Sequence, residues 1–130
     1  MKVVLINGGP HKDGCTNVAL KEIAKTLNDE NIETEIIWLG TKPIGGCIGC
    51  NQCLKNNNRC FMKEDLVNTF LDKIKDTDGF VFGSPVHFAS ASGAITSFLD
   101  RAFYGRGKLF AGKIAASVVS CRRGRSNSSI

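Results

Sequence analysis

The sequence predicts an α/β protein built on a parallel sheet, because short apolar segments alternate with segments of helical periodicity. The 130 residues suit one domain, and 42% apolar with 22% charged residues is ordinary for a folded chain. The order is strand, helix, strand, long loop, helix, strand, helix and strand, which implies right-handed crossovers between parallel strands. We therefore expect a single domain over residues 1–130, arranged as a three-layer sandwich.

Four strands are predicted from apolar runs. The first, residues 2–7, is continuously apolar from Val3 to Ile6, which is typical of a strand buried on both faces of a parallel sheet. The others are residues 33–39, 79–83 and 113–121. The sequence stops soon after the fourth strand, where such a sheet normally continues. We therefore expect either a truncated chain or a partner subunit that covers the exposed strand edge.

Three helices are predicted from apolar residues at positions i, i+3, i+4 and i+7. The first spans residues 16–28, with Thr16 or Asn17 as the expected N-cap. The other two span residues 64–76 and 91–104. The long stretch between the second strand and the second helix shows neither period, so we expect it to be irregular.

Charge is unevenly distributed along the chain, whose formal net charge is +5. Residues 101–130 contain no acidic residue and seven basic ones, of which Arg122, Arg123 and Arg125 lie in a polar tail. Such an end can attract nucleic acid or membrane, but no aromatic residues alternate with it as a single-strand binder requires. No apolar run could span a bilayer, and we see no signal peptide. We expect a cytoplasmic protein with no nucleic-acid or membrane partner.

Three segments follow predicted strands, where open α/β sheets bind their ligands. The first, residues 8–17, combines glycines with a helix start, whose amides and dipole favour a phosphate group. It lacks the dinucleotide fingerprint. It also has Cys15 where a Walker A loop has lysine, so a monophosphate suits it better than a nucleoside triphosphate. A plain strand-to-helix turn is the alternative.

The other two segments are suited to a flat anionic ring. In residues 84–93, small residues and a proline leave space beside the backbone, with His87 and Phe88 at the edge. Taken alone, Phe88 is better explained as a core residue. In residues 120–124, two adjacent arginines can stabilise a reduced ring, contact a dinucleotide phosphate, or simply lie in a solvated tail. Cys121 is expected to be buried at the strand end.

The densest motif is a group of cysteines within fourteen positions: Cys47, Cys50, Cys53 and Cys60. Without a secretory signal, a metal or redox role is favoured over disulfides. Three cysteines at successive two-residue gaps can converge on one inorganic core, which favours iron–sulfur, and Gly45, Gly46 and Gly49 permit tight wrapping. Zinc and unligated thiols remain as alternatives.

Together these motifs resemble the NAD(P)H-dependent FMN reductase family of the flavodoxin-like superfamily, and more narrowly its iron–sulfur flavoprotein branch. Residues 8–16 are similar to the family's Gly-Ser-Pro-Arg/His-x-x-Gly-Asn-Thr phosphate loop, with Gly9 and Cys15 in place of the usual Ser and Asn. Residues 84–87 resemble its Ser-Pro-Val-Tyr loop, and residues 98–101 look like its Phe-Ile-Asp-Arg helix end.

The resemblance implies a flavodoxin-like sandwich, which family members usually complete with a fifth strand and which we expect to be truncated after the fourth strand in this chain. It also implies FMN contacts at fifteen positions. They are Gly9, Pro10, His11, Gly14, Cys15, Thr16, Asn17, Ser84, Pro85, Val86, His87, Phe88, Ser120, Arg122 and Arg123. It also implies a [4Fe–4S] cluster held by Cys47, Cys50, Cys53 and Cys60, in a loop at residues 45–61.

Our first hypothesis is therefore an FMN-binding electron-transfer oxidoreductase, with NAD(P)H as a candidate electron donor. It would serve a redox partner protein or a small-molecule acceptor. The resemblance implies homo-oligomers that bring one subunit's cluster near another's flavin. Because the cofactors supply the chemistry, no side chain is predicted to be catalytic. The alternatives are a cluster-free NAD(P)H-dependent FMN or quinone reductase and a zinc-stabilised, non-enzymatic binding module.

Overall fold

The computed structural model describes residues 1–104, 106–124 and 127, whose strands form one parallel sheet. The strands are β1 (Lys2–Asn7), β2 (Glu33–Trp38), β3 (Gly79–Pro85) and β4 (Ile114–Ser120), in the spatial order β2-β1-β3-β4. In the centre, Leu5 is in register with Ile36 on one side and with Val81 on the other. The predicted α/β class with a parallel sheet is confirmed.

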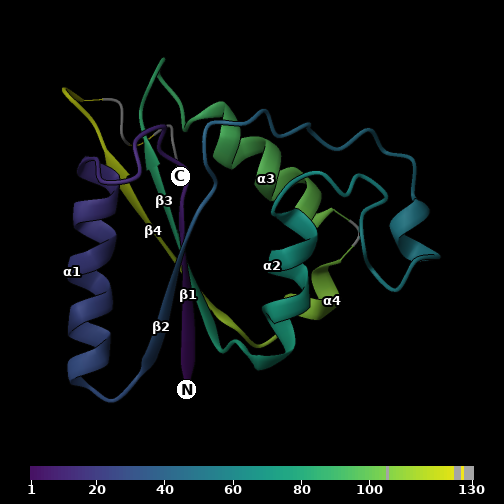
Figure 1. The fold of residues 1–130 in the computed structure, drawn as a ribbon, viewed down its shortest axis with the longest axis horizontal. Helices are drawn as coiled ribbons and strands as arrows, with labels where there is room; N and C mark the ends of the chain where they lie inside the picture. Colours follow the sequence, from purple (N-terminus) through teal and green to yellow (C-terminus); the bar gives the residue numbers. More distant parts are fainter. Residues whose placement is uncertain (105, 125–126, 128–130) are drawn as a thin grey trace.

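Helices cover both faces of the sheet (Figure 1). One face is covered by α1 (Cys15–Asp29), and the other by α2 (Val67–Lys73), α3 (Gly93–Phe103) and the four-residue α4 (Gly107–Phe110). The described residues also include two 3₁₀ helices, η1 (Gln52–Leu54) and η2 (Ile74–Asp76). Among the described residues, no helix has both the length and the apolar character needed to cross a membrane.

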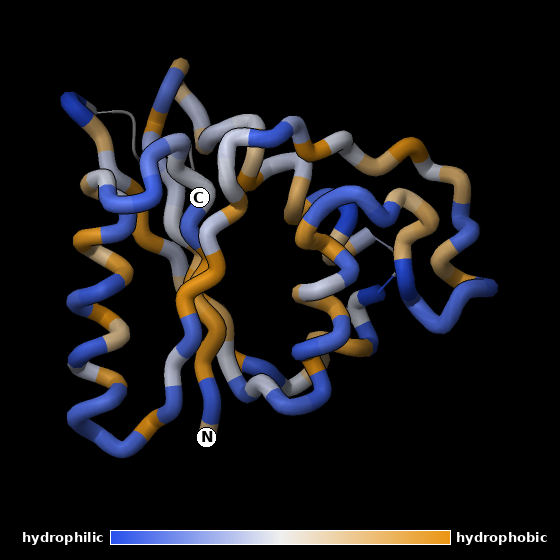
Figure 2. Tube along the Cα trace, viewed as in Figure 1, coloured by the Kyte–Doolittle hydropathy of each residue, from blue (hydrophilic) through white to orange (hydrophobic). Residues whose placement is uncertain are grey.

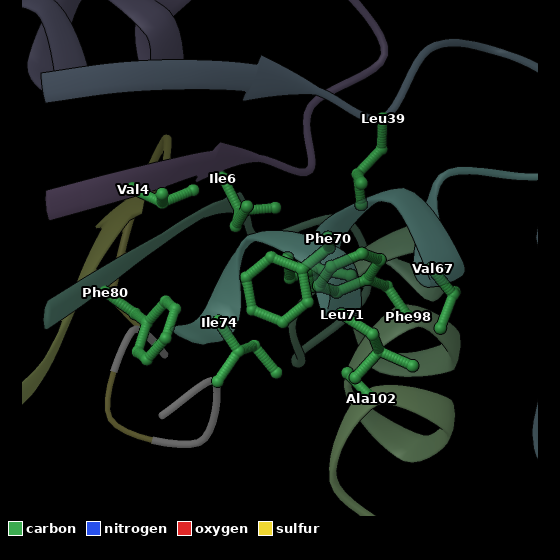
Figure 3. Close-up of a cluster of buried hydrophobic side chains, with 11 residues drawn as sticks. Val4, Ile6, Leu39, Val67, Phe70, Leu71, Ile74, Phe80, Phe98 and Ala102 are labelled. Carbon is green, nitrogen blue, oxygen red and sulfur yellow. The ribbon is translucent and has the colours of Figure 1, made fainter. Parts of the chain in front are cut away.

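The alternating side chains of β1 divide the core into two parts. Val4 and Ile6 belong to the larger cluster, which α2 and α3 complete (Figure 3). Leu5 belongs to the smaller cluster, together with Leu20 and Ala24 of α1. Both faces of β1 are thus buried, as its continuous apolar run predicts. Figure 2 shows the hydrophobic residues concentrated along these central strands.

Phe70 of α2 lies at the centre of the larger cluster. Its ring makes edge contacts with Phe80 of β3 and Phe98 of α3, with centroid separations of 5.4 and 5.0 Å. Full burial of each such side chain stabilises the fold by about 1.5–3 kcal/mol. These contacts attach α2 and α3 firmly to the sheet, so they fix the elements against which the cysteine-rich loop lies.

The first helix begins earlier than predicted. Gly14 is its N-cap and makes no side-chain capping bond, so the prediction that Thr16 or Asn17 caps the helix is wrong. Both of these residues are buried in the first turn instead. The Thr16 hydroxyl therefore makes a tertiary contact, with the Ser120 hydroxyl, rather than capping the helix.

The second helix begins at Val67, three residues later than predicted. The cause is Asp65, whose carboxylate accepts a hydrogen bond from the Val67 N–H and pairs with Arg101 of α3. A side chain that bonds its own neighbouring backbone competes with helix formation. The tertiary ion pair holds Asp65 in that position.

Several boundaries differ in smaller ways. The third strand extends to Pro85, two residues beyond the prediction, because it pairs with β4 as far as Ser120. Neither α4 nor η1 is predicted, since three or four residues are too few to show a helical period. β4 forms an edge of the sheet in the described residues, and Ile114 is 71% exposed. Part of the predicted tail, including Arg125, lies outside the described residues.

Candidate functional site

The loops after β1 and β3 are joined by hydrogen bonds at the carboxyl end of the sheet. The Gly8 N–H donates to the Gly83 carbonyl at 2.8 Å. The Ser92 hydroxyl, at the start of α3, donates to the Gly8 carbonyl at 2.7 Å, and the Ser92 N–H donates to the Ser84 hydroxyl at 2.9 Å. Because Ser84 and Ser92 are both buried, these bonds hold the two loops in one arrangement.

Ser120, at the end of β4, connects the third loop to the other two. Its carbonyl accepts a hydrogen bond from the Val86 N–H at 2.8 Å. Its hydroxyl lies 2.9 Å from the Thr16 hydroxyl in the first turn of α1. The three segments predicted to share a site are therefore brought together, over sequence separations as large as 104 residues.

Asn7 shapes the loop that follows β1, a role that the sequence analysis did not predict. Its fully buried side chain accepts a hydrogen bond from the Gly9 N–H at 2.9 Å and donates to the Lys12 carbonyl at 3.4 Å. The Gly9 carbonyl accepts from the Trp38 indole N–H at 2.9 Å. Both polar groups of Gly9 thus have protein partners, so Gly9 can line a site but does not offer its N–H to a ligand.

The start of α1 offers the unpaired donors instead. Within the described residues, the backbone N–H groups of Cys15, Thr16 and Asn17 have no protein acceptor. The Asn17 side chain, only 6% exposed, also has no hydrogen-bond partner in this part of the chain. Buried polar groups without partners are costly. Donors in the first turn of a helix suit an anion, above all a phosphate group.

The three loops line a cavity of about 480 Å³. Its lining comprises Gly9, Pro10, His11, Gly14, Cys15, Thr16, Pro85, Val86, His87, Ser120, Cys121 and Arg122. All of these except Cys121 are among the positions predicted to contact FMN. The other predicted positions, Asn17, Ser84, Phe88 and Arg123, do not line it. The cavity has the size of a small-molecule site.

Two expectations for this region are wrong. Phe88 is 88% exposed, so it does not pack in the core, because the chain turns at Ala89 with φ +52° and a bridge pairs Val86 with Ala91. The ring of Phe88 therefore lies at the outer tip of the loop. Cys121 is exposed rather than buried, since it follows the last residue of the edge strand and lines the open cavity.

The four clustered cysteines line a second, smaller cavity of about 20 Å³, roughly the space of one water molecule. Cys53 and Cys60 are buried, whereas Cys47 and Cys50 are exposed. Within the described ranges, no three His, Cys, Asp or Glu side chains are close enough together to hold a metal ion. The four thiols suit a thiophilic centre in kind, but the exposed pair would have to move inward to bind one.

The backbone of this loop shows two features suited to sulfur ligands. The Gly49 N–H donates to the Cys47 Sγ at 3.4 Å, and Gly49 has φ +67°, a conformation that glycine adopts without strain. The buried Asn68 of α2 binds both backbone groups of Cys60, accepting from its N–H and donating to its carbonyl at 2.8 Å each. Sequence spacing contains no signal for this role of Asn68.

Arg101 of α3 is a charged side chain in direct contact with one of these thiols. It is 1% exposed, and its Nε donates to the Cys60 Sγ at 3.4 Å. Burial by itself would lower the pKa of Arg101, but the hydrogen bonds to Asp65 and Cys60 raise the pKa above its ordinary value. The guanidinium is therefore a fixed positive charge beside Cys60.

The two cavities share no lining residue. Figure 1 shows the cysteine-rich loop beyond α2, on the side of the molecule away from α1. The chain thus has one candidate site at the ends of β1, β3 and β4 and another against α3.

An open parallel sheet of this strand order, with a cavity beyond the carboxyl ends of its central strands, defines a flavodoxin-like protein. The family model described as NADPH-dependent FMN reductase matches residues 1–129. The chain belongs to this family, and the resemblance stated from its motifs is confirmed.

Curated relatives are similar over much of this chain. An iron-sulfur flavoprotein of Methanocaldococcus jannaschii is 40% identical over 101 residues, which are 78% of this chain and 51% of that protein. An iron-sulfur flavoprotein of Clostridioides difficile is 30% identical and is matched over 100% of this chain and 58% of its own length. The chain spans about half the length of the curated relatives that it matches.

Solved structures show the same fold at low sequence identity. RosB with a bound 8-demethyl-8-formylriboflavin-5'-phosphate gives a TM-score of 0.75 at 18% identity, covering 99% of this chain and 55% of RosB. The apo form of an NADH:FMN oxidoreductase gives a TM-score of 0.66 at 19% identity, covering 98% and 62%. These matches establish the architecture.

Proposed function

We propose that this protein is an FMN-dependent electron-transfer oxidoreductase that also holds a [4Fe–4S] cluster. The observation on which the FMN site depends is the single cavity that three separate loops line at the strand ends. Membership of the NADPH-dependent FMN reductase family supports the same assignment. FMN supplies hydride and single-electron chemistry, while the protein supplies binding and orientation.

The residues present fit a flavin mononucleotide. The unpaired N–H groups at the start of α1, with the Thr16 hydroxyl, would hold its phosphate. Pro85, Val86 and His87 line the same cavity and would lie beside the ring. Arg122 gives the cavity a positive charge, which would favour the anionic form of a reduced flavin.

The cluster would be held by Cys47, Cys50, Cys53 and Cys60. Its assignment is supported by their shared cavity and by relatives that are called iron-sulfur flavoproteins. A cluster of this kind supplies one-electron transfer. The residues of this chain would hold it with two thiols already buried and two brought in from the surface of the loop.

An absorption spectrum of the protein purified without oxygen tests the proposal. Flavin bands together with a broad shoulder that dithionite bleaches are expected. Flavin bands alone would contradict the cluster. A colourless protein that contains zinc would contradict both cofactors and support the zinc-stabilised binding module instead.

A cluster-free NAD(P)H-dependent reductase is the second candidate. It is favoured by the exposure of Cys47 and Cys50 and by the fold shared with a structure described as an NADH:FMN oxidoreductase. Anaerobic mixing of the FMN-loaded protein with NADH and with NADPH distinguishes the candidates. Full flavin bleaching in protein that contains no iron would establish this second function.

We also propose that the protein works as a homo-oligomer, with NAD(P)H as electron donor and a redox protein or small molecule as acceptor. The separation of the two cavities within one chain supports this, because an oligomer can bring one chain's cluster near another's flavin. Analytical ultracentrifugation of the loaded protein is expected to give a species larger than one chain. A single-chain mass at micromolar concentration would contradict the oligomer. The cytoplasmic location stays a prediction.

A further inference from the structure

One buried side chain contacts both ends of the cysteine-rich loop and one of its sulfurs. Arg101 donates from Nη1 to the Gly45 carbonyl at 3.3 Å and from Nη2 to the Met62 carbonyl at 2.9 Å. Its Nε donates to the Cys60 Sγ at 3.4 Å. Gly45 precedes the first of the four cysteines and Met62 follows the last, so these bonds close the loop at its base.

The cost of burying this charge indicates that the arrangement is specific. A guanidinium that is 1% exposed must have nearly all its donors paired, because unpaired donors of a buried charge would strongly destabilise the fold. Asp65 supplies the opposite charge, and the other acceptors all belong to the loop or its flanks. Arg106 extends the same network, since it donates to the Asn58 carbonyl within the loop at 2.6 Å and to the Arg101 carbonyl.

We propose that Arg101 is a positioning residue of the cluster site: it holds the loop closed before a cluster binds and places a fixed positive charge beside the ligand sulfur of Cys60. The role of the positive charge beside the Cys60 sulfur rests on the proposed function, because it requires a bound cluster. The role of Arg101 in holding the loop closed depends only on contacts within the protein.

The fixed charge has a defined consequence for electron transfer. One-electron reduction of a [4Fe–4S] cluster adds one negative charge, with no bond formed or broken and no proton moved. The electron comes from the reduced flavin of the proposed function, or from dithionite in a titration. A hydrogen-bond donor with a full positive charge at a ligand sulfur stabilises the reduced form, so it raises the reduction potential.

Arg59 provides a matched control. It is adjacent to Cys60 in sequence and is positively charged, but its side chain pairs with Asp72 at the surface. Within the described residues its side chain makes no hydrogen bond to a sulfur or to the ends of the loop. Arg59→Lys and Arg59→Gln therefore repeat the chemical changes made at Arg101 without removing the bonds of Arg101 at the base of the loop.

The loop closure is tested on metal-free protein by limited trypsin digestion. Arg101→Lys keeps the charge but cannot reach three acceptors at once. We expect cleavage after Lys55, within the loop, to be about fivefold faster or more than in the wild type and in Arg59→Lys, which is the effect of losing an ordinary hydrogen bond. FMN affinity equal to that of the wild type would show that the fold is intact. Equal cleavage rates in all three proteins would overturn the loop-closing role.

The charge is tested on protein reconstituted with iron and sulfide without oxygen. We expect Arg101→Gln to have a lower cluster potential than the wild type, Arg101→Lys to stay near it, and both to lose iron to a chelator faster than the Arg59 variants. Equal potentials in Arg101→Gln and wild type would overturn the charge role. If Arg101→Gln does not fold, iron loss from Arg101→Lys at the wild-type rate would overturn the proposal.

Uptake of iron and sulfide by the wild-type protein distinguishes a failure of the proposed cluster from a failure of the role given to Arg101. Failure of the wild-type protein to take up iron and sulfide would overturn the proposed cluster and the charge role with it. The trypsin comparison would still decide whether Arg101 holds the loop closed.

Discussion

The loops at the strand ends and the cysteine-rich loop are held in place in different ways. The strand-end loops bond to one another, through Gly8, Ser92 and Ser120, and their anchors are the strands themselves. The cysteine-rich loop is long, and side chains from α2 and α3 hold its base, namely Asn68 and Arg101. A change in either region should therefore leave the other largely intact, because no lining residue is shared.

The largest effect is expected from Cys50→Ser. We expect it to lose most of the bound iron, because one of the four proposed cluster ligands is removed, while FMN affinity stays at the wild-type value. Metal analysis and a flavin fluorescence titration measure the two quantities. Cys121→Ser is the matched control, since Cys121 lines the other cavity, and it should retain its iron. Equal loss of both cofactors in Cys50→Ser would contradict the independence of the two regions.

Gly8→Ala should destabilise the loops at the strand ends without affecting the cysteine-rich loop. An added Cβ would lie 2.7 Å from the Ile95 Cβ and 3.1 Å from the Gly83 carbonyl oxygen, so the loop or α3 must shift. We expect the free energy of unfolding in urea to fall by about 1–3 kcal/mol and FMN binding to weaken.

Gly93→Ala is the control for this change, because an added Cβ there meets no atom within 4 Å. The iron content per folded molecule should be the same in both variants. Unchanged stability in Gly8→Ala would show that the contact between the loop and α3 is looser than the structure indicates.

Thr16→Val tests the contribution of a single hydroxyl group to the strand-end site. It removes the contact with Ser120 and one candidate phosphate donor, so FMN should bind up to about tenfold more weakly, with iron content unchanged. Isothermal titration calorimetry measures the affinity. Thr26→Val makes the same chemical change on the exposed side of α1, and its affinity should match that of the wild type. A wild-type affinity in Thr16→Val would place the phosphate elsewhere.

The smallest effect is expected at Glu35 of β2, which lies in neither cavity. Its hydrogen bond with Lys73 lowers the pKa of the carboxyl. Partial burial opposes this effect by raising the pKa, and Lys2 lowers it further. A lowered pKa in the folded state contributes stability above the carboxyl's ordinary pKa, and this contribution is lost as pH falls through the lowered value.

Glu35→Gln should therefore be less stable than the wild type at neutral pH, by at most about 1 kcal/mol, and equal to it in strong acid. Urea unfolding at a series of pH values measures the difference. A gap between the two proteins that widens as the solution is acidified would contradict the assigned direction.

Local patterns in the sequence predict one region better than the other. The run at residues 2–7, the glycines after it and the small residues after β3 indicate the strand-end cavity, because parallel strands bring their ends together. The cysteine spacing indicates a site, but not what holds it: Cys60 and Arg101 are 41 residues apart in the chain. The hydrogen bonds of Asn68 likewise depend on where α2 packs against the cysteine-rich loop. The helical period predicts the helix, but it does not predict this packing.

The bond network around Ser120 has a consequence for biosynthesis. Since β4 supplies groups that complete the pocket begun by β1, the proposed flavin pocket of a nascent chain is unfinished until β4 has left the ribosome and paired with β3. Capture of the cofactor would thus follow the pairing of β4, and it would select chains in which these four strands have already assembled.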